Sequence, residues 1–204
     1  SEPWKLPDLD KIPEIKTKIV KNTKDDKYLP YKRDEKTLSR DWALPGTPGL
    51  EHRIGGLEKA AVSGNVSYDA DNHDYMVKLR QDKIDIIADF IPELEIYGNP
   101  KGELLVLSWG GTYGACRAAV QKANENNMSV AHINLKYINP FPKNLGEILL
   151  KFNKVLIPEI NLGQLSTIIR SKFLIDTINF NRVSGKPYTT TDIYEKIEQV
   201  IEES

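Results

Sequence analysis

Residues 104–114 read LLVLSWGGTYG, and this stretch decides the fold. Its first part, Leu104–Ser108, is a continuous apolar run. Runs of this kind are typical of strands in a sheet that helices cover on both sides. The glycine pair Gly110-Gly111 then turns the chain into an expected helix from Thr112 to about Asn126, whose packing surface is made largely of alanine.

Strand and helix patterns alternate along the rest of the chain. Further strands are expected at Val130–Ile138, Val155–Ile160 and Ile178–Val183, and further helices from Pro142 to about Phe152, from Gly163 onward and over Thr190–Glu202. Thr189 can cap the last helix, with Asp192 in the capping-box position. Four such repeats predict an α/β fold, a three-layer domain with a mostly parallel sheet and right-handed crossovers.

Residues 1–70 follow no sustained period and hold six of the 12 prolines. So long a stretch without regular elements is unusual inside a compact domain. We therefore expect an N-terminal extended arm over residues 1–70 and a domain over residues 71–204, whose regular core begins at about residue 102. This domain is expected to open with a helix from a cap at Asp71 or Asn72 to about Phe90, followed by a short edge strand at Leu94 and Ile96.

Composition excludes several classes of function. The 204 residues include 28 Lys and Arg against 29 Asp and Glu, and this net charge of −1 gives no reason to bind nucleic acid or anionic membranes. No apolar run approaches the roughly 20 residues of a membrane span. With Cys116 as the one cysteine, neither an internal disulfide nor a Cys-rich zinc or iron–sulfur site can form, which favours a reducing, cytoplasmic location. The unusual start, Ser-Glu-Pro-Trp, suggests a piece of a longer protein.

Two turns are the candidate functional segments. Gly110, Gly111, Thr112, Tyr113 and Gly114 follow a strand and open a helix, where the carboxyl end of a parallel sheet and free N–H groups favour anions. Their spacing matches neither a dinucleotide fingerprint nor a P-loop, so a tight turn packed against a neighbour is the alternative.

The second turn contains Glu159 and Asn161, polar residues that end another strand. They could face a ligand, or Asn161 could cap the next helix while Gly163 relieves crowding.

The remaining candidates for chemistry predict no complete active site and no metal site. His52, His73 and His132 lie far apart in the sequence without metal-ligand spacing, and surface or capping roles are expected for them. Cys116 lies among alanines and is expected to be a small core residue.

An ordered series of motifs resembles the alpha subunits of 2-oxoacid:ferredoxin oxidoreductases of the 2-oxoglutarate type. The longest is WALPGTPGLEHRIGGLEK at residues 42–59. The resemblance extends from about Ser1 to Thr190 and continues in Gly64–Asp69, Asn72-His73, Met76, Arg80, Ser108–Gly114, Asn139–Pro142, Pro158–Leu165 and Gly185–Tyr188.

The resemblance implies a transketolase C-terminal-like domain, preceded by a linker that leaves a thiamine-enzyme domain. The implied reaction is oxidative decarboxylation of a 2-oxoacid, with 2-oxoglutarate favoured, to an acyl-CoA. Thiamine diphosphate, Mg and an iron–sulfur cluster are expected in the complete complex, and none of them is expected to bind this fragment. The implied partners are the remaining alpha-subunit domains, a beta subunit, ferredoxin and CoA.

Within that family, the role implied for this domain is to complete interfaces, with no catalytic residue in the fragment. The alternative is an autonomous α/β module that binds an anionic ligand or another protein through the Gly110–Gly114 turn.

Overall fold

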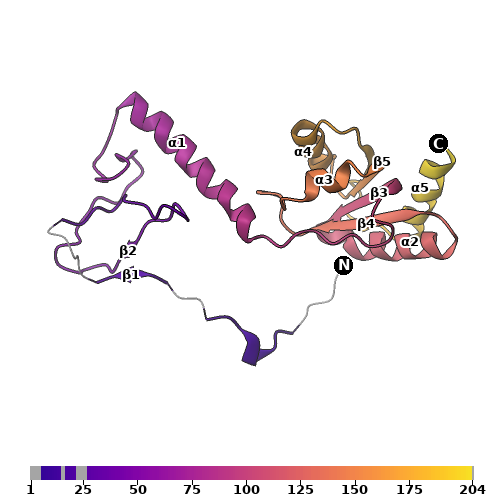
Figure 1. Ribbon diagram of the computed structural model, residues 1–204, viewed down its shortest axis with the longest axis horizontal. Coiled ribbons are helices and arrows are strands. Elements are labelled where there is room, and N and C mark those ends of the chain that lie inside the picture. Colours follow the sequence, from indigo (N-terminus) through magenta and orange to yellow (C-terminus); the bar gives the residue numbers. More distant parts are fainter. Residues whose placement is uncertain (1–5, 15–16, 22–26, 204) are drawn as a thin grey trace. The chain divides into compact units, whose positions relative to one another are not determined.

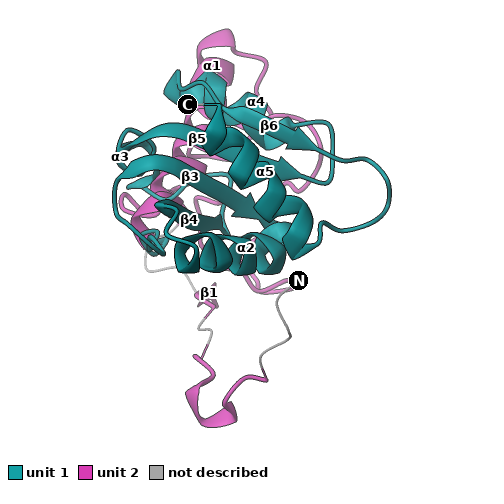
Figure 2. Cartoon of the chain, turned by 90° about the vertical axis from the view of Figure 1, so that its right-hand side faces the viewer, with its two compact units in different colours: residues 1–5, 91–204 teal, residues 6–90 magenta. Residues whose placement is uncertain are grey.

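The computed structural model describes residues 6–14, 17–21 and 27–203. By its internal contacts the chain divides into two compact units, an N-terminal unit of residues 6–90 and a C-terminal unit that begins at Ile91 (Figure 2). The helix that the sequence placed at the start of the C-terminal domain therefore groups with the N-terminal unit. No helix in the described ranges is long and apolar enough to cross a membrane.

The C-terminal unit contains a four-stranded sheet in which every pair of neighbours is parallel. The strand order is β4 (Val130–Leu135), β3 (Gly102–Trp109), β5 (Phe152–Glu159) and β6 (Ile178–Asn181). The long apolar run thus forms the central strand β3, which pairs with β4 through Leu104↔Val130 and with β5 through Leu104↔Lys154. The predicted α/β class and parallel sheet are confirmed.

Helices cover both faces of this sheet. They are α2 (Tyr113–Glu125), α3 (Leu145–Leu149), α4 (Gln164–Phe173) and α5 (Thr190–Glu202). Side chains of β3 alternate between two cores: Leu104 and Val106 join α2 and α5, whereas Leu105 and Leu107 join α3 and α4. Helix α5 crosses in front of the sheet in Figure 2. All four of these β3 side chains are fully buried, each worth about 1.5–3 kcal/mol, and both cores therefore stabilise the strand.

The loops and shorter elements differ from the prediction. Strand β4 ends at Leu135, and α3 is only five residues long, with β5 beginning at Phe152. The expected strand at residues 94–96 is absent from the described sheet. Instead, the Asn144 side chain donates to the Leu94 carbonyl and accepts from the Leu94 N–H, both at 3.0 Å. A side-chain amide therefore satisfies the backbone groups that a neighbouring strand would have paired.

Helix α5 confirms its predicted cap. Thr189 Oγ1 accepts from the Asp192 N–H at 3.1 Å, and the Asp192 carboxylate accepts from the Thr189 N–H at 2.7 Å. Arg182 also forms two hydrogen bonds to the Asp192 carboxylate. Together, the Arg182 guanidinium and the Thr189 donors hold the pKa of Asp192 well below its usual range.

The N-terminal unit contains few regular elements (Figure 1). They are the 3-10 helix η1 (Leu9–Lys11), the short parallel pair β1 (Ile19–Val20) and β2 (Trp42–Ala43), α1 (Ala70–Asp85) and the 3-10 helix η2 (Ile86–Phe90). Asp69, two residues earlier than predicted, caps α1 by accepting from the Asn72 N–H at 2.7 Å.

Few apolar side chains of this unit are buried. Among its described residues, the buried hydrophobic side chains are Leu50, Met76 and Leu79, whereas Ile54 and Tyr68 are almost fully exposed. Most apolar side chains of this unit are therefore not buried in a core of its own.

Candidate functional site

The first predicted turn is a 3-10 helix, η3 (Gly110–Thr112), that runs directly into α2. Its Thr112 hydroxyl donates to the Trp109 carbonyl at 2.9 Å and accepts from the Trp109 N–H at 3.3 Å. Gly110 has φ +56°, with open space where a Cβ would project. The turn is therefore held by hydrogen bonds between its own residues, and the Gly110 backbone is exposed.

The second predicted turn is organised by the Glu159 carboxylate, which is completely buried. Its oxygens accept from the N–H groups of Leu165 (3.0 Å) and Ser166 (3.1 Å) in the first turn of α4. They also accept from the Trp109 indole (3.2 Å) and the Asn161 amide (3.1 Å). A carboxylate is favoured here because the first N–H groups of a helix lack partners and carry positive partial charge.

The Asn161 side chain holds the turn just ahead of α4. Its side-chain oxygen accepts from the Gly163 N–H at 2.7 Å and the Gln164 N–H at 3.3 Å. Gly163 has φ +92°, and a Cβ there would lie 2.8 Å from the Asn181 amide nitrogen. Protein donors thus occupy the oxygens of both Glu159 and Asn161, but the N-cap of α4 is Gly163, so the capping role expected for Asn161 is not formed as predicted.

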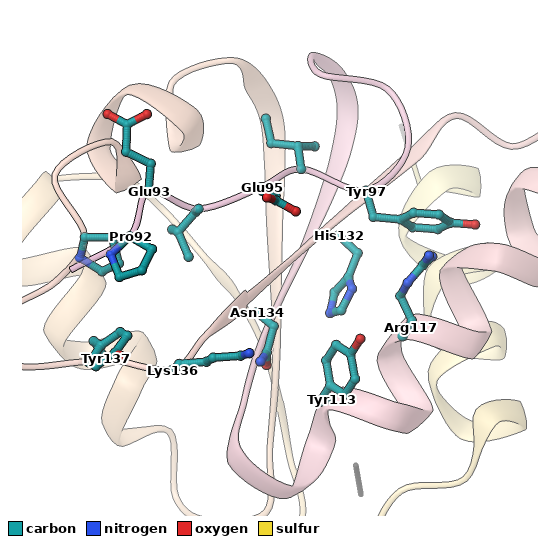
Figure 3. Close-up of a pocket in the computed structure, with 13 residues that line it drawn as sticks. Pro92, Glu93, Glu95, Tyr97, Tyr113, Arg117, His132, Asn134, Lys136 and Tyr137 are labelled. Atoms are coloured by element: carbon teal, nitrogen blue, oxygen red, sulfur yellow. The ribbon is translucent and has the colours of Figure 1, made fainter. Parts of the chain in front are cut away.

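A cavity of about 610 Å³ lies beside the first turn, within the C-terminal unit (Figure 3). Residues 92–97, the first half of α2 and the end of β4 enclose it, with Pro142 at one side. Of the predicted site residues, Tyr113 lines it. A neighbouring hollow of about 510 Å³ is lined by Gly110 and again by Tyr113.

Buried polar groups form one wall of the cavity. His132 is 2% exposed, so the surface or capping role expected for it is wrong. Its Nε2 lies 2.7 Å from the Ser108 hydroxyl, which lies 2.9 Å from the Asn134 side-chain oxygen. Burial, reinforced by the charge of Arg117, lowers the pKa of His132 to about 4. The imidazole is therefore neutral at pH 7.

Two cations line the same cavity. Arg117 on α2 stacks over the Tyr97 ring, and its buried Nη1 has no hydrogen-bond partner among the described residues. Lys136 follows β4 and extends toward Asn134 in Figure 3. Within the described ranges, no carboxylate forms a salt bridge with either cation.

Sequence reasoning missed these residues, although one signal was present. His132, Asn134 and Lys136 alternate along and just beyond β4, so they lie on one face of that strand. Arg117 and the covering segment at residues 92–97 gave no comparable signal, because their approach depends on tertiary packing.

The remaining groups give no catalytic set. Cys116 is buried, as predicted, and burial raises the pKa of its thiol to about 12. A nucleophilic cysteine needs the thiolate. In the part of the chain that the structure describes, no group of three or more His, Cys, Asp and Glu side chains could hold a metal ion.

Exposed apolar side chains follow three strands at the carboxyl edge of the sheet. This edge patch consists of Tyr137 and Ile138 after β4, Ile160 and Leu162 after β5, and Val183 after β6. A Cβ on Gly111 would lie 3.8 Å from Ile160 Cδ1, so the first turn adjoins the patch. Such clustering at one edge is typical of an interaction surface.

No model of a known protein family matches the chain. The 2-oxoglutarate oxidoreductase subunit KorA of Mycobacterium tuberculosis is 48% identical over 195 residues, which make up 95% of this chain and 29% of that protein. The alpha subunit of 2-oxoacid:ferredoxin oxidoreductase 1 of Sulfurisphaera tokodaii is 27% identical over 211 residues, 98% of this chain and 32% of that protein.

A solved structure agrees with these relatives. The 2-oxoglutarate:ferredoxin oxidoreductase from Magnetococcus marinus, with 2-oxoglutarate, coenzyme A and succinyl-CoA bound, matches 96% of this chain and 34% of that chain. The TM-score is 0.86 at 28% identity. The chain thus spans about a third of the length of the proteins it matches, and the resemblance seen in its motifs is confirmed.

Proposed function

We propose that this chain, which is related over nearly its whole length to part of the alpha subunit of 2-oxoacid:ferredoxin oxidoreductases, serves as the C-terminal portion of such a subunit. The observation that carries the proposal is the 48% identity over 95% of the chain to a 2-oxoglutarate oxidoreductase subunit. The complete complex would convert a 2-oxoacid, with 2-oxoglutarate as the favoured substrate, and CoA to an acyl-CoA and carbon dioxide. Two electrons would pass to ferredoxin.

Thiamine diphosphate would supply the carbanion chemistry of this reaction. A diphosphate-bound Mg needs several oxygen ligands, and the described residues contain no cluster of three or more metal-ligating side chains. We therefore assign no catalytic step to this chain, and we place the thiamine, Mg and iron–sulfur sites in the missing two thirds of the alpha subunit and in a beta subunit.

The role of this portion is to complete interfaces. The edge patch exposes Leu162 to 80% and Val183 to 69%, and the N-terminal unit exposes Ile54 to 89% and Tyr68 to 88%. Burying apolar area contributes about 25 cal/mol per Å². These side chains would gain this free energy by packing against the remaining alpha-subunit domains and the beta subunit.

The proposal also includes domain boundaries at residues 1–70 and 71–204 and a cytoplasmic location.

The first test is enzymatic. The purified 204-residue chain, given 2-oxoglutarate, CoA, thiamine diphosphate and a viologen acceptor, should show no turnover, and an assembled complex that contains it should reduce the acceptor. Turnover by the chain alone would overturn the assignment of the chemistry to other parts of the complex.

The second test addresses the interface with matched variants. Leu162→Asp changes the edge patch. Leu150→Asp changes a leucine of nearly equal exposure, 78%, which lies just before the amino end of β5 and so at the other end of the strands. We expect Leu162→Asp to reduce co-purification with the partner subunit and Leu150→Asp to leave it unchanged. Equal retention of the partner by both variants would contradict the placement of the interface.

A further inference from the structure

The cavity beside α2 is lined by two cations that no described carboxylate pairs, although two glutamates stand at its rim. Arg117 and Lys136 both line it, and neither forms a salt bridge with a described carboxylate. The buried Nη1 of Arg117 also lacks a hydrogen-bond acceptor among the described residues. An unsatisfied buried donor of this kind is unfavourable, so this geometry favours an acceptor from outside the chain.

We propose that this cavity binds a small organic oxoanion, a carboxylate or a phosphate ester, held by Arg117 and Lys136. Guanidinium and ammonium groups form strong, charge-assisted hydrogen bonds with such oxygens. The Asn134 amide and the Tyr113 hydroxyl line the cavity as additional donors. This site differs from an anion site on the Gly110–Gly114 turn, because its charges come from side chains of α2 and of the segment that follows β4.

The cavity can also hold the body of an organic ligand. Its volume of about 610 Å³ falls within the usual range of small-molecule pockets, about 300–1,000 Å³. Tyr97, Tyr113 and Tyr137 contribute aromatic surface, and Pro92 adds apolar surface. A bare inorganic anion would leave most of this surface uncovered, so the natural ligand carries an apolar or aromatic group.

The protein fixes the cavity wall before a ligand arrives. The backbone of Tyr97 exchanges two hydrogen bonds with His132, at 2.8 and 2.9 Å, which tie the covering segment to β4. The hydrogen-bonded series His132, Ser108 and Asn134 orients the polar wall. A neutral His132 adds no charge, and the anion is therefore held by Arg117 and Lys136.

Two carboxylates oppose this charge at the cavity rim. Glu93 and Glu95 line the cavity and are exposed to solvent. Glu93 points away from the other side chains in Figure 3, whereas the Glu95 carboxylate points toward them. Glu95 should therefore weaken anion binding, and its removal gives the test a second, oppositely signed variant.

The experiment titrates the full chain with succinate and, separately, with inorganic phosphate at constant ionic strength, followed by ¹H–¹⁵N NMR. We expect saturable shifts for at least one probe, localised to residues 92–97, the first half of α2 and the end of β4. The two probes distinguish a carboxylate ligand from a phosphate ligand. Absence of saturation with both would overturn the proposal.

Variants distinguish a specific site from nonspecific attraction of anions by surface lysines. Lys136 is exposed, so Lys136→Met should fold. It should weaken binding about tenfold, because one charge-assisted hydrogen bond is lost. Lys186→Met, which removes an exposed lysine from the Gly185 turn, should change nothing, and Glu95→Gln should tighten binding. Equal weakening by Lys136→Met and Lys186→Met would refute the site.

Discussion

The buried carboxylate of Glu159 offers the sharpest test of how the sheet edge is built. It joins the ends of β3 and β5 to the start of α4, through the Trp109 indole and the N–H groups of Leu165 and Ser166. In Glu159→Gln the shape is kept, but an NH₂ group replaces one acceptor oxygen. At least one buried N–H then faces a donor, and the negative charge at the helix N-terminus is lost.

The magnitude follows from these contacts. Loss of a hydrogen bond to a charged group costs about 1.5–3 kcal/mol, and loss of the charge at a partly buried helix N-terminus costs up to about 2 kcal/mol. We therefore expect the free energy of unfolding to fall by about 3 kcal/mol. With a urea dependence of about 2 kcal/mol/M, the unfolding midpoint falls by about 1.5 M.

The assay is urea unfolding followed by circular dichroism, with Trp fluorescence as a second probe because the Trp109 indole loses a charged acceptor. Glu195→Gln, at an exposed position on α5, is the matched control and should stay within about 0.5 kcal/mol of the parent. If Glu159→Gln also stays within that range, Glu159 does not hold the start of α4 and the reasoning is refuted.

Three further predictions concern the same unit. Because the pKa of folded His132 is about 4 and that of the unfolded residue about 6.5, the unfolded chain binds more protons between these values. The free energy of unfolding should therefore fall by about 3 kcal/mol from pH 6.5 to pH 4. In His132→Gln, urea unfolding should show a smaller dependence of this free energy on pH, and an unchanged dependence would contradict the prediction. Gly163→Ala, whose Cβ would lie 2.8 Å from the Asn181 side chain, should destabilise more than Gly185→Ala, which also has a positive φ (+68° against +92°) but open space; equal thermal melts would count against crowding. Thr189→Ala removes one partner of the capping box and should cost about 1 kcal/mol, measured by urea unfolding, and no loss would show that the cap contributes nothing.

The regular core was predictable because its sequence pattern and its packing agree. The apolar run at Leu104–Ser108 is buried on both faces, and the capping box at Thr189 is formed as expected. In both cases the local sequence is sufficient: an uninterrupted apolar run predicts burial on two faces, and a Thr and an Asp three residues apart predict the capping box. The second turn was anticipated only in part, because Asn161 accepts from the Gly163 and Gln164 N–H groups as a local turn residue can, whereas the N-cap of α4 is Gly163.

Most of the cavity could not be predicted, because its residues come from separate segments and its one local signal is the alternation of His132, Asn134 and Lys136. Leu94 pairs with Asn144, 50 positions along the chain, where a strand was expected from local alternation. The buried state of His132 depends on the covering segment at residues 92–97 and on α2. The role of Glu159 likewise depends on Trp109, again 50 positions away. Such pairings arise from tertiary structure and leave no local pattern.

The role proposed for this chain is that of an interface-forming part of a 2-oxoacid:ferredoxin oxidoreductase alpha subunit. A chimera tests it most directly, in which this chain replaces the 195-residue matching part of the M. tuberculosis subunit. The chimera is co-produced with the partner subunit, and CoA-dependent 2-oxoglutarate oxidation is measured on the purified complex. We predict assembly and activity comparable with the parent. Failure to assemble would contradict the interface role, and an assembled, cofactor-loaded complex without activity would contradict the claim that catalysis resides elsewhere.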